Sequence, residues 1–90
     1  MNSLDEVYEQ MRLFQQTLTE FNAEMRASAA ELSKAHDQVC GIWQDEAAQG
    51  YRSAYEPLAN SLDLYLRANA PRFEKFIESK AGQLQRYLNE

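Results

Sequence analysis

Apolar residues recur every seven positions through the first part of the chain, without a slip between Leu4 and Val39. One row of this repeat is Leu4, Met11, Leu18, Met25, Leu32 and Val39, and a second row is Val7, Phe14, Phe21, Ser28 and Ala35. A heptad pattern of this kind is typical of a helix that buries one stripe against another helix. Ser3-Leu4-Asp5-Glu6 fits a capping box at its start. The pattern predicts a helix over about residues 4–40.

A turn is expected over residues 41–44, followed by a second helix from about residue 45. Gly41 suits the left-handed position that often ends a helix. Asp45, or Gln44 just before it, is a candidate N-cap for the next helix. Because the connection is short, the two helices are expected to lie antiparallel.

The second helix, over about residues 45–69, is apolar on more than one side. Its first stripe is Ala47, Tyr51, Ala54, Leu58, Leu62 and Tyr65, and a second is Ala48, Tyr55, Ala59 and Leu66. One neighbouring helix can cover only one of these stripes. We therefore expect the hairpin to pair with itself, or with a related hairpin, into a four-helix bundle. The residues expected in the hairpin or dimer interface are Phe14, Leu18, Phe21, Met25, Ala47, Tyr51, Leu58 and Leu62.

Two prolines are expected to disturb the second helix. Pro57 removes an amide donor and should bend it, and Pro71 disfavours helical dihedrals at the residue before it. Residues 71–89 again show helical spacing of apolar residues, either as a kinked continuation or as a separate short helix; the kinked continuation is favoured. The fold prediction is thus a single all-α domain over residues 1–90, an antiparallel helical hairpin with a kinked second helix.

Small residues cluster late in the first helix, where Ala27-Ser28-Ala29-Ala30 is followed by Ala35. Small side chains allow close approach, which would place the tightest helix crossing there. Alanine also favours helix on a solvent-exposed side, so both interpretations stay open.

The charge balance argues against several partners. With a net charge of −5, the surface repels phosphate backbones and anionic lipid, so nucleic acid is not an expected partner. The sequence has no apolar run long enough to span a membrane and no features of a cleavable signal peptide. Export, if it occurs, is expected by a route that does not use such a peptide; otherwise the protein is expected in the cytoplasm.

Catalytic motifs are not found. His36 and Cys40 stand four residues apart, but two ligands make a poor metal site and no other Cys or His exists to complete one. His36 is expected to be an exposed helical residue. The sequence also lacks a glycine-rich phosphate loop and a nucleophile elbow. We expect a protein with no enzymatic activity, no cofactor and no metal.

Trp43 stands out because a large aromatic residue in an interhelical turn either plugs the end of the bundle or anchors a partner. Together with Ala47-Ala48 and Tyr51, which follow it, Trp43 resembles the Trp-x-Gly motif of the WXG family, the small helical-hairpin proteins of type VII secretion. Asp45 occupies the position of the motif glycine. Asp45 is expected to start the second helix and to hold the direction of the Trp43 ring.

The resemblance implies a dimeric hairpin that is secreted, or that escorts a larger secreted effector. The C-terminal export signal of that family, Tyr followed four residues later by Asp or Glu, is not found, since Tyr87 is followed only by Leu88, Asn89 and Glu90. In the family, the partner that lacks the glycine often lacks its own signal. The alternative is a cytoplasmic helical adaptor or chaperone subunit unrelated to secretion.

Overall fold

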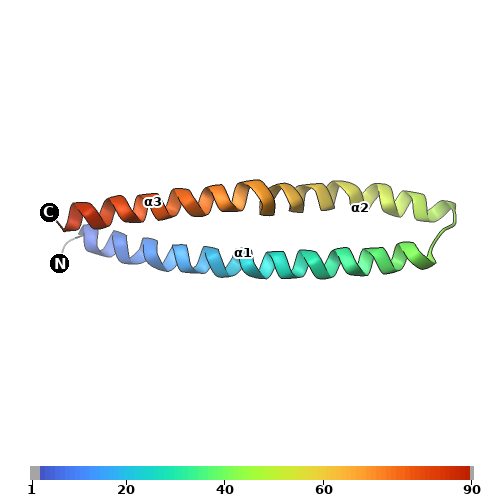
Figure 1. Ribbon diagram of the computed structural model, residues 1–90, viewed down its shortest axis with the longest axis horizontal. Helices are drawn as coiled ribbons and strands as arrows, with labels where there is room; N and C mark the ends of the chain where they lie inside the picture. Colours follow the sequence, from blue (N-terminus) through green and yellow to red (C-terminus); the bar gives the residue numbers. More distant parts are fainter. Residues whose placement is uncertain (1–2, 90) are drawn as a thin grey trace.

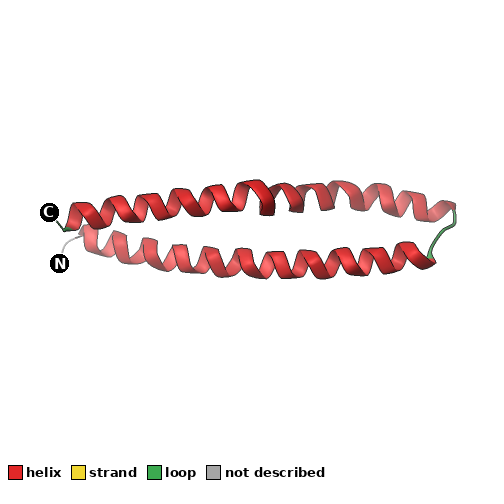
Figure 2. Cartoon of the chain, in the orientation of Figure 1, coloured by secondary structure: helices red, strands yellow, loops and turns green. Residues whose placement is uncertain are grey.

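The computed structural model, which describes residues 3–89, is an antiparallel hairpin of two long helices (Figure 1). The first is α1 (Ser3–Ile42); the second consists of α2 (Glu46–Leu64), a π-helical turn η1 (Tyr65–Asn69) and α3 (Ala70–Leu88) without interruption. We call α2, η1 and α3 together the composite helix. Within residues 3–89 the structure is helical outside the loop and the chain end, and has no strand (Figure 2). The prediction of an all-α hairpin is confirmed.

The first helix does not end as expected. Gly41 lies inside α1, and no described glycine has a positive φ angle, so the prediction of a left-handed glycine cap is wrong. The carbonyl groups at the end of α1 accept other hydrogen bonds. The Trp43 amide donates to the Val39 carbonyl at 2.8 Å. The Arg52 guanidinium donates to the carbonyl oxygens of Trp43 at 3.1 Å and of Cys40 at 3.5 Å. A cation at this end also suits the negative end of the helix dipole.

Asp45 is the N-cap of α2, as the sequence indicated. Its backbone is extended, and its carboxylate accepts a hydrogen bond from the Ala48 amide at 3.3 Å. This bond satisfies one of the free amides at the start of a helix. Pro57 lies inside α2, and the helix continues past it.

The expected break at residues 69–71 is replaced by the π-turn just before Pro71. The Ala70 amide donates to the Tyr65 carbonyl, five residues back instead of four. In that pattern the donor for the Leu66 carbonyl is the amide of Pro71, which proline does not have. The Leu66 carbonyl instead accepts a hydrogen bond from Arg26 of α1 at 3.3 Å. The second helix is therefore a continuation, as favoured from the sequence, and its irregularity is one π-turn.

The seam between the two helices uses only one of the two predicted heptad rows of α1. The residues of α1 that are buried or half-buried along it include Leu4, Tyr8, Met11, Gln15, Leu18, Asn22, Met25, Ala29, His36 and Val39. The second predicted row, with Val7, Phe14 and Phe21, is exposed. Its place is taken by residues four positions after the first row, because Asn22 and His36 find hydrogen-bond partners across the seam. Hydrophobicity alone predicted that Val7, Phe14 and Phe21 lie in the seam, and that prediction is wrong.

The π-turn shifts the seam of the composite helix by one residue. Before it, the seam positions include Ala48, Tyr55, Ala59, Leu62 and Leu66, at spacings of three, four and seven. Continued by sevens, these positions would lead to Asn69, Phe73, Phe76 and Lys80. The structure instead buries Ala70, Ile77 and Ala81. The π-turn adds one residue to the helix, so α3 is rotated about its axis, and Ala70, Ile77 and Ala81 face α1.

The closest approach of the helices lies along α3, so the expectation of the tightest crossing at Ala27–Ala30 is wrong. The backbone of α1 lies closer to α3 than to α2, and the ribbons in Figure 1 converge toward the end that carries the termini. Opposite Ala29 and Ala30 the space holds the larger side chains of Tyr55 and Leu62, which line a groove of about 320 Å³ there. Large residues on the facing helix cancel the effect of the small ones.

The isolated hairpin has little core. The described hydrophobic residues that are buried are Ala48, Ala70, Ile77 and Ala81. The molecule measures 66 × 16 × 15 Å and exposes 6957 Å² of surface. A compact monomer of the same mass exposes about 5,400 Å². The hairpin thus exposes more surface than a compact monomer does, and the difference is larger than the roughly 800 Å² that each partner contributes to a standard interface.

Candidate protein–protein interface

The two sides of the hairpin, each formed jointly by both helices, differ in polarity. We call one side the open flank; it contains Val7, Phe14 and Phe21 of α1 and Leu58, Phe73 and Phe76 of the composite helix. These side chains are between 42% and 52% exposed. Most of them lie three positions after seam residues, so they share one side of each helix. Contiguous exposed apolar surface of this kind marks an interaction site more often than scattered apolar residues do.

Ring contacts show that the two helices contribute to the same side. The rings of Phe14 and Phe73 meet edge to face across the helices, with centroids 6.1 Å apart. Phe73 stacks with Phe76 at 6.3 Å, and the Lys80 ammonium lies 5.4 Å from the centre of the Phe76 ring. These residues therefore form a connected aromatic surface in the half of the hairpin that holds the chain termini.

The opposite side, which we call the polar flank, contains residues one position after those of the seam. Its exposed members include Arg12, Thr19, Arg26 and Ser33 of α1 and Glu56, Asp63, Glu78 and Gln85 of the composite helix. The apolar residues among the exposed positions of α1 on this side, Ala23 and Ala30, are small, so this side has no counterpart of the exposed phenylalanines. The hairpin as a whole therefore has one side with large exposed apolar residues and one mainly polar side. Each single helix is amphipathic as well.

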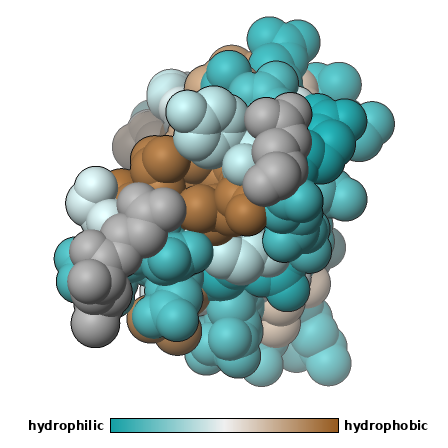
Figure 3. Space-filling model, turned by 90° about the vertical axis from the view of Figure 1, so that its left-hand side faces the viewer, coloured by the Kyte–Doolittle hydropathy of each residue, from teal (hydrophilic) through white to brown (hydrophobic). Residues whose placement is uncertain are grey.

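Grooves run along the apolar residues near the termini. One, of about 800 Å³, is lined by residues that include Val7, Met11 and Phe14. Another, of about 520 Å³, is lined by residues that include Met11, Leu84 and Tyr87. In Figure 3, which views the molecule from the end that carries the termini, hydrophobic surface is visible between the two helices.

The eight residues predicted for a hairpin or dimer interface divide between two places. Leu18, Met25, Tyr51 and Leu62 are half-buried along the seam, whereas Phe14, Phe21, Ala47 and Leu58 are exposed. The first four therefore serve the hairpin itself. The exposed four are left for a partner, and their role in a dimer stays a prediction.

At the turn, Asp45 contacts the start of α2 and the Trp43 ring, the two features that it was expected to influence. One carboxylate oxygen accepts from the indole Nε1–H of Trp43 at 2.9 Å and from the Ala48 amide at 3.3 Å. Trp43 is half-buried, and its ring centre lies 5.6 Å from that of Tyr51. A glycine at position 45 has no side chain to offer the indole. The use of Trp43 as a partner anchor remains a prediction.

His36 is half-buried, not exposed as expected. Its Nδ1 lies 2.8 Å from the Tyr51 hydroxyl, its ring stacks on Tyr55 with centroids 3.7 Å apart, and its Nε2 lies 3.4 Å from the Cys40 sulfur. Both ring nitrogens are therefore engaged within the hairpin. Across residues 3–89, no group of three or more His, Cys, Asp or Glu side chains is placed to hold a metal ion.

Sequence reasoning did not single out the polar residues that cross the seam. Asn22 is fully buried, accepts from the Tyr65 hydroxyl at 2.7 Å and donates to Glu74 at 2.9 Å. Arg26 and Arg52 each donate to backbone carbonyls of the facing helix or turn. One available signal was the position of Asn22, four residues after the seam residue Leu18.

In comparison with known proteins, no protein-family model, no curated protein and no solved structure matches this chain. In the part of the chain that the structure describes, no helix has both the length and the apolar character to cross a membrane.

Proposed function

We propose that this chain is a non-catalytic interaction protein that pairs through its open flank with a second helical hairpin to form a four-helix bundle. The observation that carries the proposal is the contrast between the two sides of the hairpin. Phe14, Phe21, Phe73 and Phe76 are exposed on one side, while the other side carries polar residues. A flat apolar side joined to a second such side gives a bundle core.

The size of the side chains on the open flank varies along its length. The phenylalanines Phe14, Phe21 and Phe73 lie in the half with the termini. Toward the turn the open flank has Leu58, and the exposed residues Ala35 and Ala47 there are small. Cores pack best when large residues face small ones. This distribution favours a head-to-tail arrangement, in which the terminal half of one hairpin covers the turn half of the other.

The biological setting proposed follows from the resemblance to the WXG family. A paired hairpin would act as a small secreted factor, or as the escort of a larger secreted effector. Trp43, half-buried beside Tyr51 at the turn end, would then contact the effector or the export machinery. The support for this setting is the sequence of the turn and the hairpin architecture.

The test is the mass of the particle in solution. The double variant Phe14→Ser/Phe73→Ser removes the ring pair that joins the two helices on the open flank. The matched control, Arg12→Ser/Glu78→Ser, alters the same two helices on the polar flank. We expect a dimer mass by light scattering at micromolar concentration for the unaltered chain and the control, and a monomer mass for the double Phe variant. A monomeric unaltered chain with full helicity would overturn homodimer formation, and co-expression with candidate hairpins would then test a heterodimer.

A further inference from the structure

The middle of the seam is polar, although a seam between two helices is normally apolar. Asn22 has no exposed surface and is the largest fully buried side chain of the described residues. Its carbonyl oxygen accepts from the Tyr65 hydroxyl, and its amide nitrogen donates to a Glu74 carboxylate oxygen. Tyr65 is the first residue of the π-turn, and Glu74 lies in the first part of α3. Asn22 therefore bonds to the first residue of the π-turn and to a residue of α3, the helix that follows the turn.

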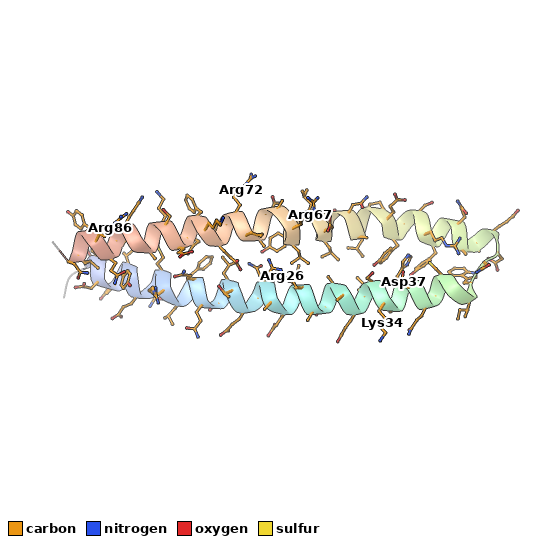
Figure 4. All side chains as sticks on the ribbon, in the orientation of Figure 1. Arg26, Lys34, Asp37, Arg67, Arg72 and Arg86 are labelled. Atoms are coloured by element: carbon orange, nitrogen blue, oxygen red, sulfur yellow. The ribbon has the colours of Figure 1, made fainter. Side chains whose placement is uncertain are left out.

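Arg26, one turn further along α1, bonds to the π-turn itself. Its guanidinium donates to the Leu66 carbonyl, which has no amide donor within the composite helix because Pro71 lies five residues ahead. Figure 4 shows Arg26 on the side of α1 that faces the composite helix, whereas Arg72 points away from α1. The π-turn is thus bonded to α1 at Tyr65 and Leu66, and α3 is bonded to α1 at Glu74.

The composite helix has two ways to continue past residue 66. As an uninterrupted α-helix, it would place Phe73, Phe76, Lys80 and Tyr87 against α1, because these positions continue the seam of α2 by sevens. With the π-turn, it places Ile77, Ala81 and Leu84 against α1 and leaves Phe73 and Phe76 exposed. Both sets contain large apolar side chains. The second requires a π-turn, and the first requires Pro71 inside a regular α-helix, where the Arg67 carbonyl has no amide donor. Burial of apolar surface therefore separates the two registers only weakly.

We propose that Asn22 is a positioning residue that selects the π-turn register and thereby determines which side chains of α3 form the open flank. In the uninterrupted register Phe73 replaces Glu74 at the seam, and the buried Asn22 amide loses its acceptor. An unsatisfied buried amide shifts such an equilibrium by about tenfold to a hundredfold. A single buried Asn is known to specify register in helix pairs in this way. The effect on partner binding rests on the function proposed above; the effect on register does not.

The register can be read from one methyl group, because Ile42 and Ile77 are the two isoleucines of the chain. Ile77 is 8% exposed and Ile42 is 88% exposed. With ¹³C-methyl isoleucine, we expect nuclear Overhauser contacts from Ile77 to seam residues of α1 in the unaltered chain. In Asn22→Leu these contacts should weaken to half or less, as the uninterrupted register becomes populated. Unchanged contacts in Asn22→Leu would overturn the proposal. Asn22→Ala removes the same two bonds without added bulk and decides the question should Asn22→Leu not fold.

Deleting Ala68 supplies a rescue that a merely structural role of Asn22 would not give. The deletion removes the extra residue, so an uninterrupted α-helix then brings Ile77 and Ala81 to the seam without a π-turn. We expect full Ile77 contacts in the deletion variant, and equally full contacts when Asn22→Leu is added to it. If Asn22→Leu reduces the contacts equally with and without the deletion, the proposal fails.

Association is measured separately on the same four proteins. Since both copies of a homodimer must hold the π-turn register, the apparent dissociation constant should rise with the inverse square of the fraction of molecules in that register, so a fraction of one tenth weakens association about a hundredfold. If the Ile77 contacts shift as expected while association is unchanged, the register selection holds and the assignment of the open flank as the interface fails. If both stay unchanged, the register proposal fails.

Discussion

The half of the hairpin that holds the chain termini and the half that holds the turn are stabilised by different kinds of side chain. Along α3 the seam contains Ala70, Ile77 and Ala81, all buried, and the helices approach closely. Along α2 it contains His36, Tyr51 and Tyr55: the His36 ring stacks on Tyr55 and hydrogen-bonds to the Tyr51 hydroxyl. Small aliphatic residues permit close packing, whereas rings with polar atoms occupy more space and need partners.

The same contrast applies to the outer surface. The terminal half exposes Phe14, Phe73 and Phe76 on the open flank, so its packing is incomplete without a partner. In the turn half, the polar atoms of Trp43 and His36 are bonded within the hairpin. The aromatic part of the open flank therefore lies in the terminal half. In the turn half these polar atoms are satisfied by the hairpin's own residues, while Leu58 and Ile42 stay exposed.

The largest expected effect compares one seam residue from each half. Ile77→Ala should lower the free energy of unfolding by about 2–5 kcal/mol, because it opens a cavity in the closely packed half. Leu62→Ala should cost less than about 2 kcal/mol, since Leu62 is half-buried and already borders a groove. Urea unfolding of both variants at equal protein concentration measures the difference. An equal or larger loss at Leu62 would remove the distinction between the halves.

A smaller effect is expected at the turn. Asp45→Ala removes the N-cap of α2 and the acceptor of the Trp43 indole, and should cost about 1–2 kcal/mol. Asp45→Asn retains an oxygen acceptor and serves as the control, with most of the stability kept. Thermal unfolding gives the stability, and the emission of Trp43 should move to longer wavelength in the Ala variant only. A normal emission spectrum in Asp45→Ala would mean that the carboxylate does not position the ring.

The smallest effect concerns Gly41. Because Gly41 is helical and has open space at the position of a Cβ atom, Gly41→Ala should stabilise the protein by about 0.5–1 kcal/mol. Gly82→Ala, in the terminal half and also with open space at that position, is the comparison and should give a similar gain. The melting temperatures of the two variants measure both effects. A lower melting temperature in Gly41→Ala alone would mean that Gly41 is a left-handed cap after all.

Much of the fold could be predicted because it depends on local pattern. The uninterrupted heptads gave the first helix, Asp45 gave the start of the second, and the short connection gave the antiparallel hairpin. The two stripes of the second helix also indicated that one neighbour would not cover it. Helix propensity, capping and hydrophobic periodicity act over a few residues and are visible in a single sequence.

The errors lie where two helices meet. Gly41 was expected to cap α1, but Arg52 from the facing helix donates to the carbonyls there. One interpretation of the alanines at residues 27–30 was that they allow the closest crossing, but Tyr55 and Leu62 lie opposite them across a groove of about 320 Å³. In both cases the deciding side chain is distant in sequence, and no local pattern contains it.

By itself, the sequence determined that this chain forms two long amphipathic helices joined by a short turn, with more apolar surface than one hairpin can bury. Only the tertiary structure decided which row of α1 faces the seam and which side of α3 stays exposed. The physical reason is that several apolar rows compete for the seam at similar gain in buried area. The choice among them depends on hydrogen bonds across the helices, above all those of Asn22 with Tyr65 and Glu74.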